Sequence, residues 1–294
     1  MLTEAEFESR RLALRDWIHS VAIPAEESVE AWDEIPEELV AQMRANGYFG
    51  WIIPEAHGGA GMNMEQLVRM NLEIAQAGPA FRARSGTNTG IGVEGLVRDG
   101  TEEQKARFLP ALARGEITSC LALTEPGAGS DALAMTTTAR RAEGGYVLNG
   151  TKAFITNAPI ADLFTVIART GPADSRKPSA FSAFLVERGT SGLRTGPAYR
   201  KMGQAGSPVS EVYFEDCFVP EANLIGGEEG RGFGTVMKAL NKQRISLAGL
   251  CIGLAIRLLD ESVSHALRRE QFGSRIGDFQ LVQAMIADSQ TDFH

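Results

Sequence analysis

The residues with the clearest capacity for chemistry lie in the segment 120–131, which reads Cys-Leu-Ala-Leu-Thr-Glu-Pro-Gly-Ala-Gly-Ser-Asp. An apolar run that suits a strand leads there into a turn. In this turn Pro126 fixes φ, while Gly127 and Gly129 leave backbone amides accessible. Ser130 adds a hydroxyl donor. Such a turn can donate several hydrogen bonds to the carbonyl groups of a heterocycle or to a pyrophosphate.

The same glycines fit a loose dinucleotide-binding fingerprint, Gly127-x-Gly129-x-x-Ala132. That fingerprint requires a helix directly after the turn, so that the helix N-terminus meets the phosphate. Residues 136–138 are instead three threonines, and a strand pattern follows them. This context argues against a Rossmann-type site. Taken alone, the turn is also consistent with a purely structural role.

A second segment, 150–157, reads Gly-Thr-Lys-Ala-Phe-Ile-Thr-Asn and has the alternation of a strand. Phe154 and Thr156 fall on one face of that strand. An aromatic ring and a hydroxyl two residues apart can cover one face of an isoalloxazine ring and hydrogen-bond its edge. Taken alone, the segment is an ordinary strand whose phenylalanine belongs to the core.

The composition is that of an ordinary globular protein, with 294 residues, 44% hydrophobic and 22% charged, and a net charge of −8. An acidic chain is a poor partner for nucleic acid, and an anionic cofactor would need local arginines. No apolar run is long enough to cross a bilayer, and the acidic N-terminus resembles neither a signal peptide nor a transit peptide. These features predict a protein without a membrane span that is located in the cytoplasm.

The residue types that bind metals or form disulfides show no pattern along the chain. Cys120, Cys217 and Cys251 are far apart and include no CxxC pair, which predicts neither a disulfide framework nor a zinc site. The four histidines form no cluster in the sequence. We therefore expect reduced cysteines and no metal site.

Changes in hydrophobic periodicity predict an α+β protein with three domains. Residues 1–115 have a helical pattern, with capping-box spacing at Thr3 and Glu6 and again at Thr101 and Gln104. This stretch predicts an N-terminal α-helical domain.

Residues 116–225 consist of short β-rich runs separated by Gly, Pro and Asn, with no helical pattern between them. Such spacing predicts a central antiparallel β-barrel domain rather than a parallel sheet. Asn149-Gly150 is a strong hairpin signal, so we expect a turn there between two strands. Both chemically interesting segments fall in this domain.

The helical period returns in residues 226–294, where apolar residues recur at helical spacing from Val236 to Leu258. A second helix begins after Asp278 and reaches His294 in mid-pattern, without a capping glycine or proline. Two helices cannot readily bury their apolar faces alone. We therefore expect a C-terminal helical-bundle domain that is incomplete in this chain.

Together these motifs resemble those of the acyl-CoA dehydrogenase family. Thr-Glu-Pro-Gly-Ala-Gly-Ser-Asp at 124–131 matches the family's flavin-binding signature. Lys-Ala-Phe-Ile-Thr-Asn at 152–157 matches its second flavin strand, where tryptophan is common at the position of Phe154. Arg-Arg-Glu-Gln-Phe-Gly at 268–273, followed by Gln280, matches a third motif. The resemblance extends over the whole chain and its order of domains.

The resemblance implies noncovalent FAD, with the flavin ring between the two motifs of the β-domain. The first motif would meet the pyrimidine side of the ring and then the phosphate region, and the second would pack on the dimethylbenzene side towards N5. Two more residues would reach the FAD of a neighbouring subunit in a dimer or homotetramer, where an arginine can fork onto pyrophosphate oxygens. The cofactor-binding residues implied in this way are Leu121, Leu123, Thr124, Gly129 and Ser130, then Phe154, Ile155 and Thr156, and finally Arg269 and Gln280.

The family's contacts to acyl-CoA fall on Ser130, Asn241 and Arg244, although a structural ion pair would also explain Arg244. The resemblance implies α,β-dehydrogenation of an acyl-CoA thioester to the trans-2-enoyl-CoA, as in the β-oxidation of fatty acids. A carboxylate would remove the α-proton, while the β-hydrogen leaves as hydride to flavin N5. The electrons would then pass to electron-transfer flavoprotein.

The sequence supplies no catalytic base for this reaction. The family's glutamate usually lies in a C-terminal part beyond the position of His294, and in a minority of members it lies just before the arginine equivalent to Arg244. This chain has Gln243 at the latter position, and an amide cannot act as a base. Glu125 and Asp131 have the character of turn-forming residues. We therefore assign no catalytic residue and expect a chain ending at His294 to lack useful desaturase activity.

Two other functions are compatible with the same residues. One is an acyl-CoA oxidase or flavin monooxygenase of the same architecture, in which oxygen reoxidises the flavin. The other is a truncated, catalytically silent paralogue that binds flavin or CoA, or that serves as an interaction module.

Overall fold

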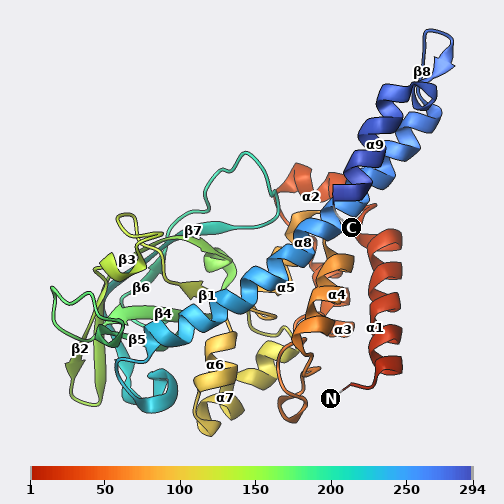
Figure 1. Ribbon diagram of the computed structural model, residues 1–294. Coiled ribbons are helices and arrows are strands. Elements are labelled where there is room, and N and C mark those ends of the chain that lie inside the picture. The colour runs from red at the N-terminus through yellow and green to blue at the C-terminus, as the bar shows by residue number, and fades with distance from the viewer. Residues whose placement is uncertain (1, 293–294) are drawn as a thin grey trace.

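The computed structural model describes residues 2–292. The chain forms an N-terminal helical domain, a central β-domain and a long C-terminal helix that continues into a hairpin projecting from the body (Figure 1). This arrangement confirms the predicted α+β class and the order of its parts. Within the described residues, no helix combines the length and the apolar character that crossing a membrane would require.

The N-terminal domain packs its helices around an aromatic core. Trp17 makes edge-on contacts with Tyr48 and Phe81, at centroid distances of 5.3 and 5.7 Å. Both predicted capping boxes are formed, at the starts of the first and the last helix of the domain. The helices are α1 (Glu4–Trp17), α2 (Glu26–Trp32), α3 (Glu37–Ala45), α4 (Met64–Ile74), α5 (Pro79–Gly86), α6 (Glu94–Asp99) and α7 (Glu102–Ala113).

The central domain is built on one sheet with the strand order β1-β4-β2-β3-β7-β6, in which β5 also pairs with β4. Its strands are β1 (Ser119–Ala122), β2 (Thr138–Ala142), β3 (Gly145–Thr156), β4 (Leu163–Arg169), β5 (Phe181–Glu187), β6 (Leu193–Thr195) and β7 (Val209–Pro220). Most pairings are antiparallel, but β4 runs parallel to β1 and, at one residue pair, to β2. The predicted barrel is therefore confirmed as an open half-barrel, with parallel pairings that we had not expected.

The prediction of a hairpin turn at Asn149-Gly150 is wrong. Both residues lie inside β3, and the two-residue turn between β2 and β3 contains Gly144 instead. Gly150 marks a register shift in the pairing of β3 with β7 and has φ 148°. A Cβ at this position would lie 2.7 Å from the Cα of Thr137, so the glycine is needed for a close backbone approach rather than for a turn.

The C-terminal part begins with α8 (Gly232–Arg268) and continues through β8 (Glu270–Gln271) and β9 (Ser274–Arg275) to α9 (Gln280–Asp292). The first two thirds of α8 pack against the rest of the protein. Asn71 of α4 donates a buried 2.7 Å hydrogen bond to the hydroxyl of Ser246. A Cβ at Gly253 would lie 2.4 Å from the carbonyl oxygen of Leu72, so the two helices approach each other closely here.

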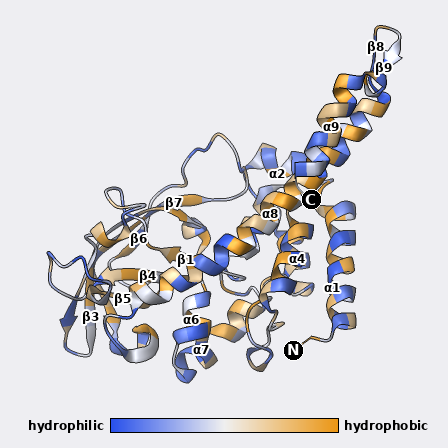
Figure 2. Cartoon of the chain, viewed as in Figure 1, coloured by the Kyte–Doolittle hydropathy of each residue, from blue (hydrophilic) through white to orange (hydrophobic). Residues whose placement is uncertain are grey.

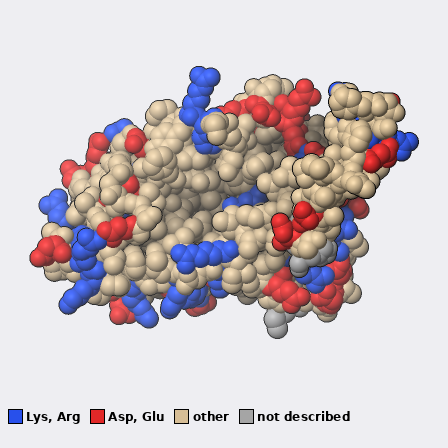
Figure 3. All heavy atoms as spheres, turned by 45° about the horizontal axis from the view of Figure 1, so that its top comes forward, with Lys and Arg blue, Asp and Glu red and all other residues tan. Residues whose placement is uncertain are grey.

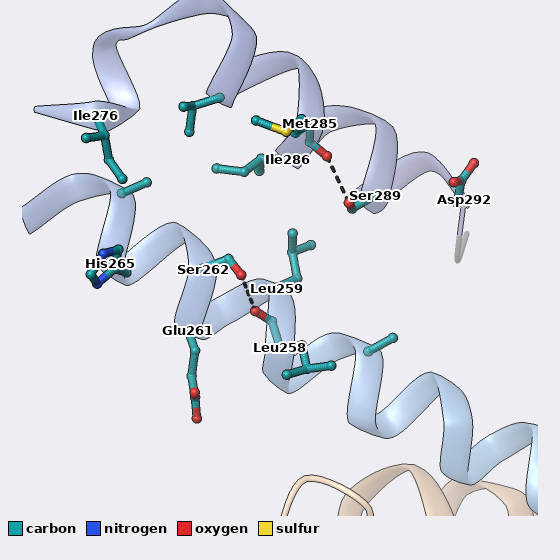
Figure 4. A pocket seen from close by; sticks show the side chains of 13 residues that line it. Leu258, Leu259, Glu261, Ser262, His265, Ile276, Met285, Ile286, Ser289 and Asp292 are labelled. Carbon is teal, nitrogen blue, oxygen red and sulfur yellow. Dashed lines mark hydrogen bonds between the residues drawn. The ribbon is translucent and has the colours of Figure 1, made fainter. Parts of the chain in front are cut away.

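The end of α8 and the whole of α9 form the projecting hairpin, in which hydrophobic and hydrophilic residues alternate (Figure 2). Leu258, Leu281 and Met285 each expose more than half of their surface. A groove of about 950 Å³ separates the two helices, and Figure 4 shows Leu259 and Ile286 beside it. Its lining is mostly apolar, and exposed apolar surface of this kind is typical of a site that contacts another protein or a ligand.

Replacing Gly150 by Ala should lower the free energy of unfolding by about 2–4 kcal/mol, because the new Cβ adds a clash to an unfavourable φ. Gly144→Ala is the matched control. It changes a positive-φ glycine that has open space around it, so only backbone strain of about 1–2 kcal/mol is expected. Urea denaturation of both variants measures the difference, and equal losses would contradict this account of Gly150.

Candidate functional site

The turn after β1 is closed by its own backbone and open to solvent at its tip. Glu125 and Ala128 exchange two backbone hydrogen bonds of 2.9 and 3.1 Å. The next residues, Gly129 and Ser130, are exposed, and a Cβ at Gly129 would meet no atom closer than 4.0 Å. The turn can therefore present backbone amides and one hydroxyl to a ligand.

The residues that lead into this turn alternate between the core and an accessible face. Leu121 and Leu123 are half-buried, whereas Ala122 between them is fully buried. Thr124 is also half-buried. The two leucines thus share one face of the chain, where they can contact a flat apolar ligand.

A buried ion pair connects this turn to strand β3. Lys152 is completely buried, and its Nζ lies 2.9 Å from Oε1 of Glu125 and 3.0 Å from the carbonyl oxygen of Leu123. Sequence reasoning missed both partners, because Glu125 was interpreted as a turn-forming residue. The available signal was a lysine within an otherwise apolar strand, since a buried charge requires a partner.

The carboxylate of Glu125 is saturated with hydrogen bonds. Besides Lys152, it accepts from the backbone amide of Thr136 at 2.6 Å and from that of Thr137 at 2.9 Å. Burial favours a higher pKa for Glu125, but the charge of Lys152 and these hydrogen bonds outweigh burial and lower the pKa to about 2. Burial lowers the pKa of Lys152 to about 8, although Glu125 opposes that change.

The end of β3 turns an aromatic ring outwards. A register shift in the pairing with β7 places Phe154 at φ 58°, and its side chain is 68% exposed. The ring lies 5.4 Å from that of Tyr199, at an interplanar angle of 55°. Thr156 is half-buried, whereas the side chain of Ile155 lies in the core, so only the backbone of Ile155 can meet a ligand.

Two further contacts hold this strand end in place. The amide of Ala153 donates to the carbonyl oxygen of Thr124 at 2.9 Å, which joins the two motifs directly. The buried side chain of Asn157 donates to the carbonyl oxygen of Ala83 and to the hydroxyl of Thr87, at 2.8 and 3.0 Å. Asn157 therefore fastens the strand end to α5 and the segment after it, a role that sequence reasoning did not assign.

The surface is hollowed between the β-domain and the helices, and atoms of basic side chains lie within the hollow (Figure 3). The segment after α5 lies beside β1, because the side-chain oxygen of Asn88 accepts from the amide of Ser119 at 2.8 Å. The side chain of Gln243 on α8 reaches this segment at Gly90, where a Cβ would clash with it. Helix α8 thus borders the region in which the two motifs meet.

The predicted substrate residues Asn241 and Arg244 are exposed on this part of α8. The guanidinium of Arg244 donates to the side-chain oxygen of Asn241 at 3.0 Å. Arg244 forms no ion pair within residues 2–292, so the alternative of a structural ion-pair partner finds no support there. Both side chains are available to a ligand.

Arg269 and Gln280 do not join the other predicted residues. Arg269 follows the last residue of α8 and Gln280 begins α9, so both lie on the projecting hairpin and both are exposed (Figure 1). Within one chain they cannot reach the turn after β1. Their assignment to the cofactor of a neighbouring subunit stays a prediction.

The buried carboxylates near the site are already paired. Glu125 is held by Lys152, and Glu94 of α6 is buried against the ammonium group of Lys242. Neither is free to act as a base. Among the residues that the structure describes, no group of three or more His, Cys, Asp or Glu is placed to hold a metal ion. His294, where the sequence pattern ended, lies outside the described residues.

Three family models match the chain in sequence order. They are described as the acyl-CoA dehydrogenase N-terminal domain, at residues 4–116, the middle domain, at 120–217, and the C-terminal domain, at 230–294. The middle-domain match contains both motifs that the ion pair joins.

Individual relatives agree with these matches. An acyl-CoA dehydrogenase of Bacillus subtilis is 38% identical over 281 residues, covering 96% of this chain and 73% of the relative. A 3-(aryl)acrylate reductase of Clostridium sporogenes is 39% identical, covering 96% of this chain and 74% of the relative. The structure of an acyl-CoA dehydrogenase complexed with FAD, from Bacillus anthracis, is 35% identical with a TM-score of 0.89, covering 99% of this chain and 49% of that one.

Replacing Lys152 by Met should lower the free energy of unfolding by about 3–5 kcal/mol, because Glu125 would become a buried charge without a partner. The double variant K152M/E125Q should recover part of this loss, since it buries no lone charge. Lys177→Met, at an exposed position, is the control and should stay within about 0.5 kcal/mol of the parent. If urea denaturation gave equal losses for the single and double variants, the two residues would not be coupled.

The lowered pKa of Glu125 predicts a specific loss of stability in acid. Its folded pKa of about 2 lies below the ordinary value of 4.5, so its stabilisation is fully present above 4.5 and is lost as the pH falls towards 2. In Glu125→Gln, the urea midpoint should therefore fall less between about pH 5 and about pH 3 than in the parent protein. An identical fall in both proteins would exclude Glu125 as the titrating group.

Proposed function

We propose that this chain, which belongs to the acyl-CoA dehydrogenase family, binds FAD between its two β-domain motifs and acts in the α,β-dehydrogenation of an acyl-CoA thioester. The observation that carries the proposal is the buried Lys152–Glu125 pair. This pair holds the exposed donors of one motif and the exposed ring of the other on a single rigid support. A preassembled support of this kind lowers the ordering cost of binding a large cofactor.

The residues present fit an isoalloxazine dinucleotide. The exposed ring of Phe154 and the half-buried Leu121 and Leu123 offer apolar surface to a planar ring system. The exposed amides of Gly129 and Ser130 suit oxygen acceptors, and a protein with a net charge of −8 needs such local donors for an anion. FAD, when bound, supplies the acceptor for a hydride from the substrate.

We assign the thioester to the side of the site that α8 borders. Asn241 and Arg244 are exposed there and offer an amide and a guanidinium to the CoA portion, while Ser130 contributes a hydroxyl. A guanidinium suits phosphate groups because it can donate two parallel hydrogen bonds. We assign no base to this chain, because its nearby buried carboxylates are both in ion pairs.

The partners follow from the same proposal. Electron-transfer flavoprotein would accept the electrons, with fatty acid β-oxidation in the cytoplasm as the setting. The projecting hairpin would contact other copies in a homodimer or homotetramer, and its exposed apolar residues support such an interface. Arg269 and Gln280 on that hairpin would then reach a neighbour's FAD.

Anaerobic titration tests the function directly. The protein is loaded with FAD, mixed with acyl-CoA thioesters of several lengths, and followed by the bleaching of flavin absorbance and by the enoyl-CoA formed. The chain ending at His294 is expected to bind FAD without useful bleaching, because it supplies no base. A longer protein that contains this chain together with a base should show substrate-dependent bleaching, with reoxidation by electron-transfer flavoprotein but not by oxygen. Reoxidation by oxygen alone would favour an oxidase or a monooxygenase, and failure to bind FAD would refute the proposal.

Replacing Phe154 by Ala should raise the dissociation constant for FAD about tenfold, since stacking on an aromatic ring contributes roughly 0.5–1.5 kcal/mol beyond buried area. Trp32→Ala is the matched control, because Trp32 is equally exposed, at 68%, but belongs to α2 and to neither motif. Fluorescence titration of FAD with both variants gives the comparison. Equal affinities for the two variants would remove Phe154 from the cofactor site.

A further inference from the structure

The ring of Phe154 points outwards because of an irregularity in strand β3. Lys152 pairs with Val212 and Ile155 pairs with Ser210, so β3 has one residue more than β7 between these two pairs. Such a bulge redirects a side chain, and Phe154 within it has φ 58° and is 68% exposed. An aromatic ring with so much exposed surface changes rotamer rapidly unless a neighbour restricts it.

Tyr199 is the neighbour that restricts this ring. The two ring centroids lie 5.4 Å apart, a separation that aromatic pairs prefer, and both rings border a groove of about 520 Å³. Burial raises the pKa of Tyr199, whereas a hydrogen bond from the backbone of Phe154 opposes that rise. Tyr199 therefore meets Phe154 at its ring and at its backbone.

The backbone of Tyr199 is fixed to the same part of the sheet. Its amide donates to the carbonyl oxygen of Val209 at 2.8 Å. Val209 begins β7 and pairs with Thr156 at the end of β3. The strand end that carries the Phe154 ring and the residue that contacts this ring are thus held on one support.

Segment 199–206, which we call the strap, runs from this support to helix α2 (Figure 1). Its far end is fixed at Gly206, whose amide donates to Oδ1 of Asp33, directly after α2, at 2.7 Å. A Cβ at Gly206 would lie 2.7 Å from Cγ1 of Val29, so the strap meets α2 closely. Between its ends the strap borders a groove of about 710 Å³, and Met202 is fully exposed. The strap is therefore anchored at both ends and open to solvent between them.

We propose that Tyr199 is a positioning residue of the cofactor site: it holds the Phe154 ring in the orientation in which that ring stacks on the flavin, and the strap holds Tyr199. This inference rests on the proposed function, which places FAD against Phe154. A ring that is already oriented loses less conformational freedom when it stacks on a ligand. Affinity for FAD then rises without any contact between Tyr199 and the flavin. Because the strap ends at Gly206, the orientation depends on the N-terminal domain as well.

A double-mutant cycle tests the role of Tyr199. Dissociation constants for FAD are measured by fluorescence titration of the parent, Tyr199→Ala, Phe154→Ala and the double variant. Tyr199→Ala should weaken FAD binding about 2- to 10-fold, as expected when one more side chain must be ordered on binding. With Phe154→Ala already present, the same change should have no effect, because Tyr199 acts only through that ring. An undiminished effect in that background, or no effect in the parent, would overturn the proposal.

Conservative variants separate the ring contact from general damage. Tyr199→Phe should keep the parent affinity because it retains the ring. Phe218→Ala is the matched control, since it removes another exposed aromatic ring of β7 and should also keep the parent affinity. An equal loss of affinity in Tyr199→Phe and Tyr199→Ala would overturn a role based on the ring. If urea denaturation shows that Tyr199→Ala does not fold, Tyr199→Leu carries the cycle.

Two glycines of the strap test its part in the proposal. Gly206→Ala should displace the strap from α2, because the new Cβ would clash with Val29, and should weaken FAD binding as Tyr199→Ala does. Gly203→Ala is the matched control in the same segment, where a Cβ would meet no atom within 4 Å, and should keep the parent affinity. Equal affinities of these two variants would overturn the role of the strap.

Failure of the proposed function would look different. If the parent chain binds no FAD, the proposed function is wrong. If FAD binds and Phe154→Ala weakens it while Tyr199→Ala does not, only the role of Tyr199 is wrong. An unchanged affinity in every variant would overturn this inference while FAD binding itself stood.

Discussion

Lys152 and Glu125 lie 27 residues apart in the sequence and share one buried position in the β-domain. If the turn after β1 moved away from strand β3, the ion pair would break and leave a buried charge without a partner. Such a charge is costly, so the pair holds the two segments together. The accessible groups on both segments, among them Ser130 and Phe154, are therefore positioned relative to each other by an interaction that is itself buried.

The backbone at the end of β3 is strained, as expected where side chains are held in unusual directions. Phe154 and Asn157 are non-glycine residues with φ values of 58° and 64°, a conformation that costs of order 1–3 kcal/mol. At Phe154 the strain turns a large apolar ring towards solvent. At Asn157 it is offset by two buried hydrogen bonds to α5 and the segment after it. The backbone at the strand end is therefore less stable locally, and this strain orients the side chains of Phe154 and Asn157.

The sequence predicted what depends on near neighbours in the chain. Capping boxes, the change from helical to strand periodicity and the two motifs were readable because three to eight residues define each of them. Asn149-Gly150 correctly predicted an unusual backbone conformation. The pairing of β3 with β7 shows that this conformation is an irregularity within a strand and not a turn. The environments of Glu125 and Arg82 could not be predicted from nearby sequence. Glu125 is paired with Lys152, and the buried Nε of Arg82 makes no hydrogen bond within residues 2–292. Both facts depend on segments that are distant in the chain.

Helix α8 belongs to two parts of the molecule at once. At about 1.5 Å per residue, its 37 residues span about 55 Å. Contacts at Ser246, Gly253 and Arg257 hold the helix against α4 and α2, so only about 17 Å of its length, beyond Arg257, projects from the body. The proposed substrate residues Asn241 and Arg244 and the projecting hairpin therefore share one continuous helical backbone. A partner that bound the hairpin would be connected through this backbone to the side of the site that α8 borders.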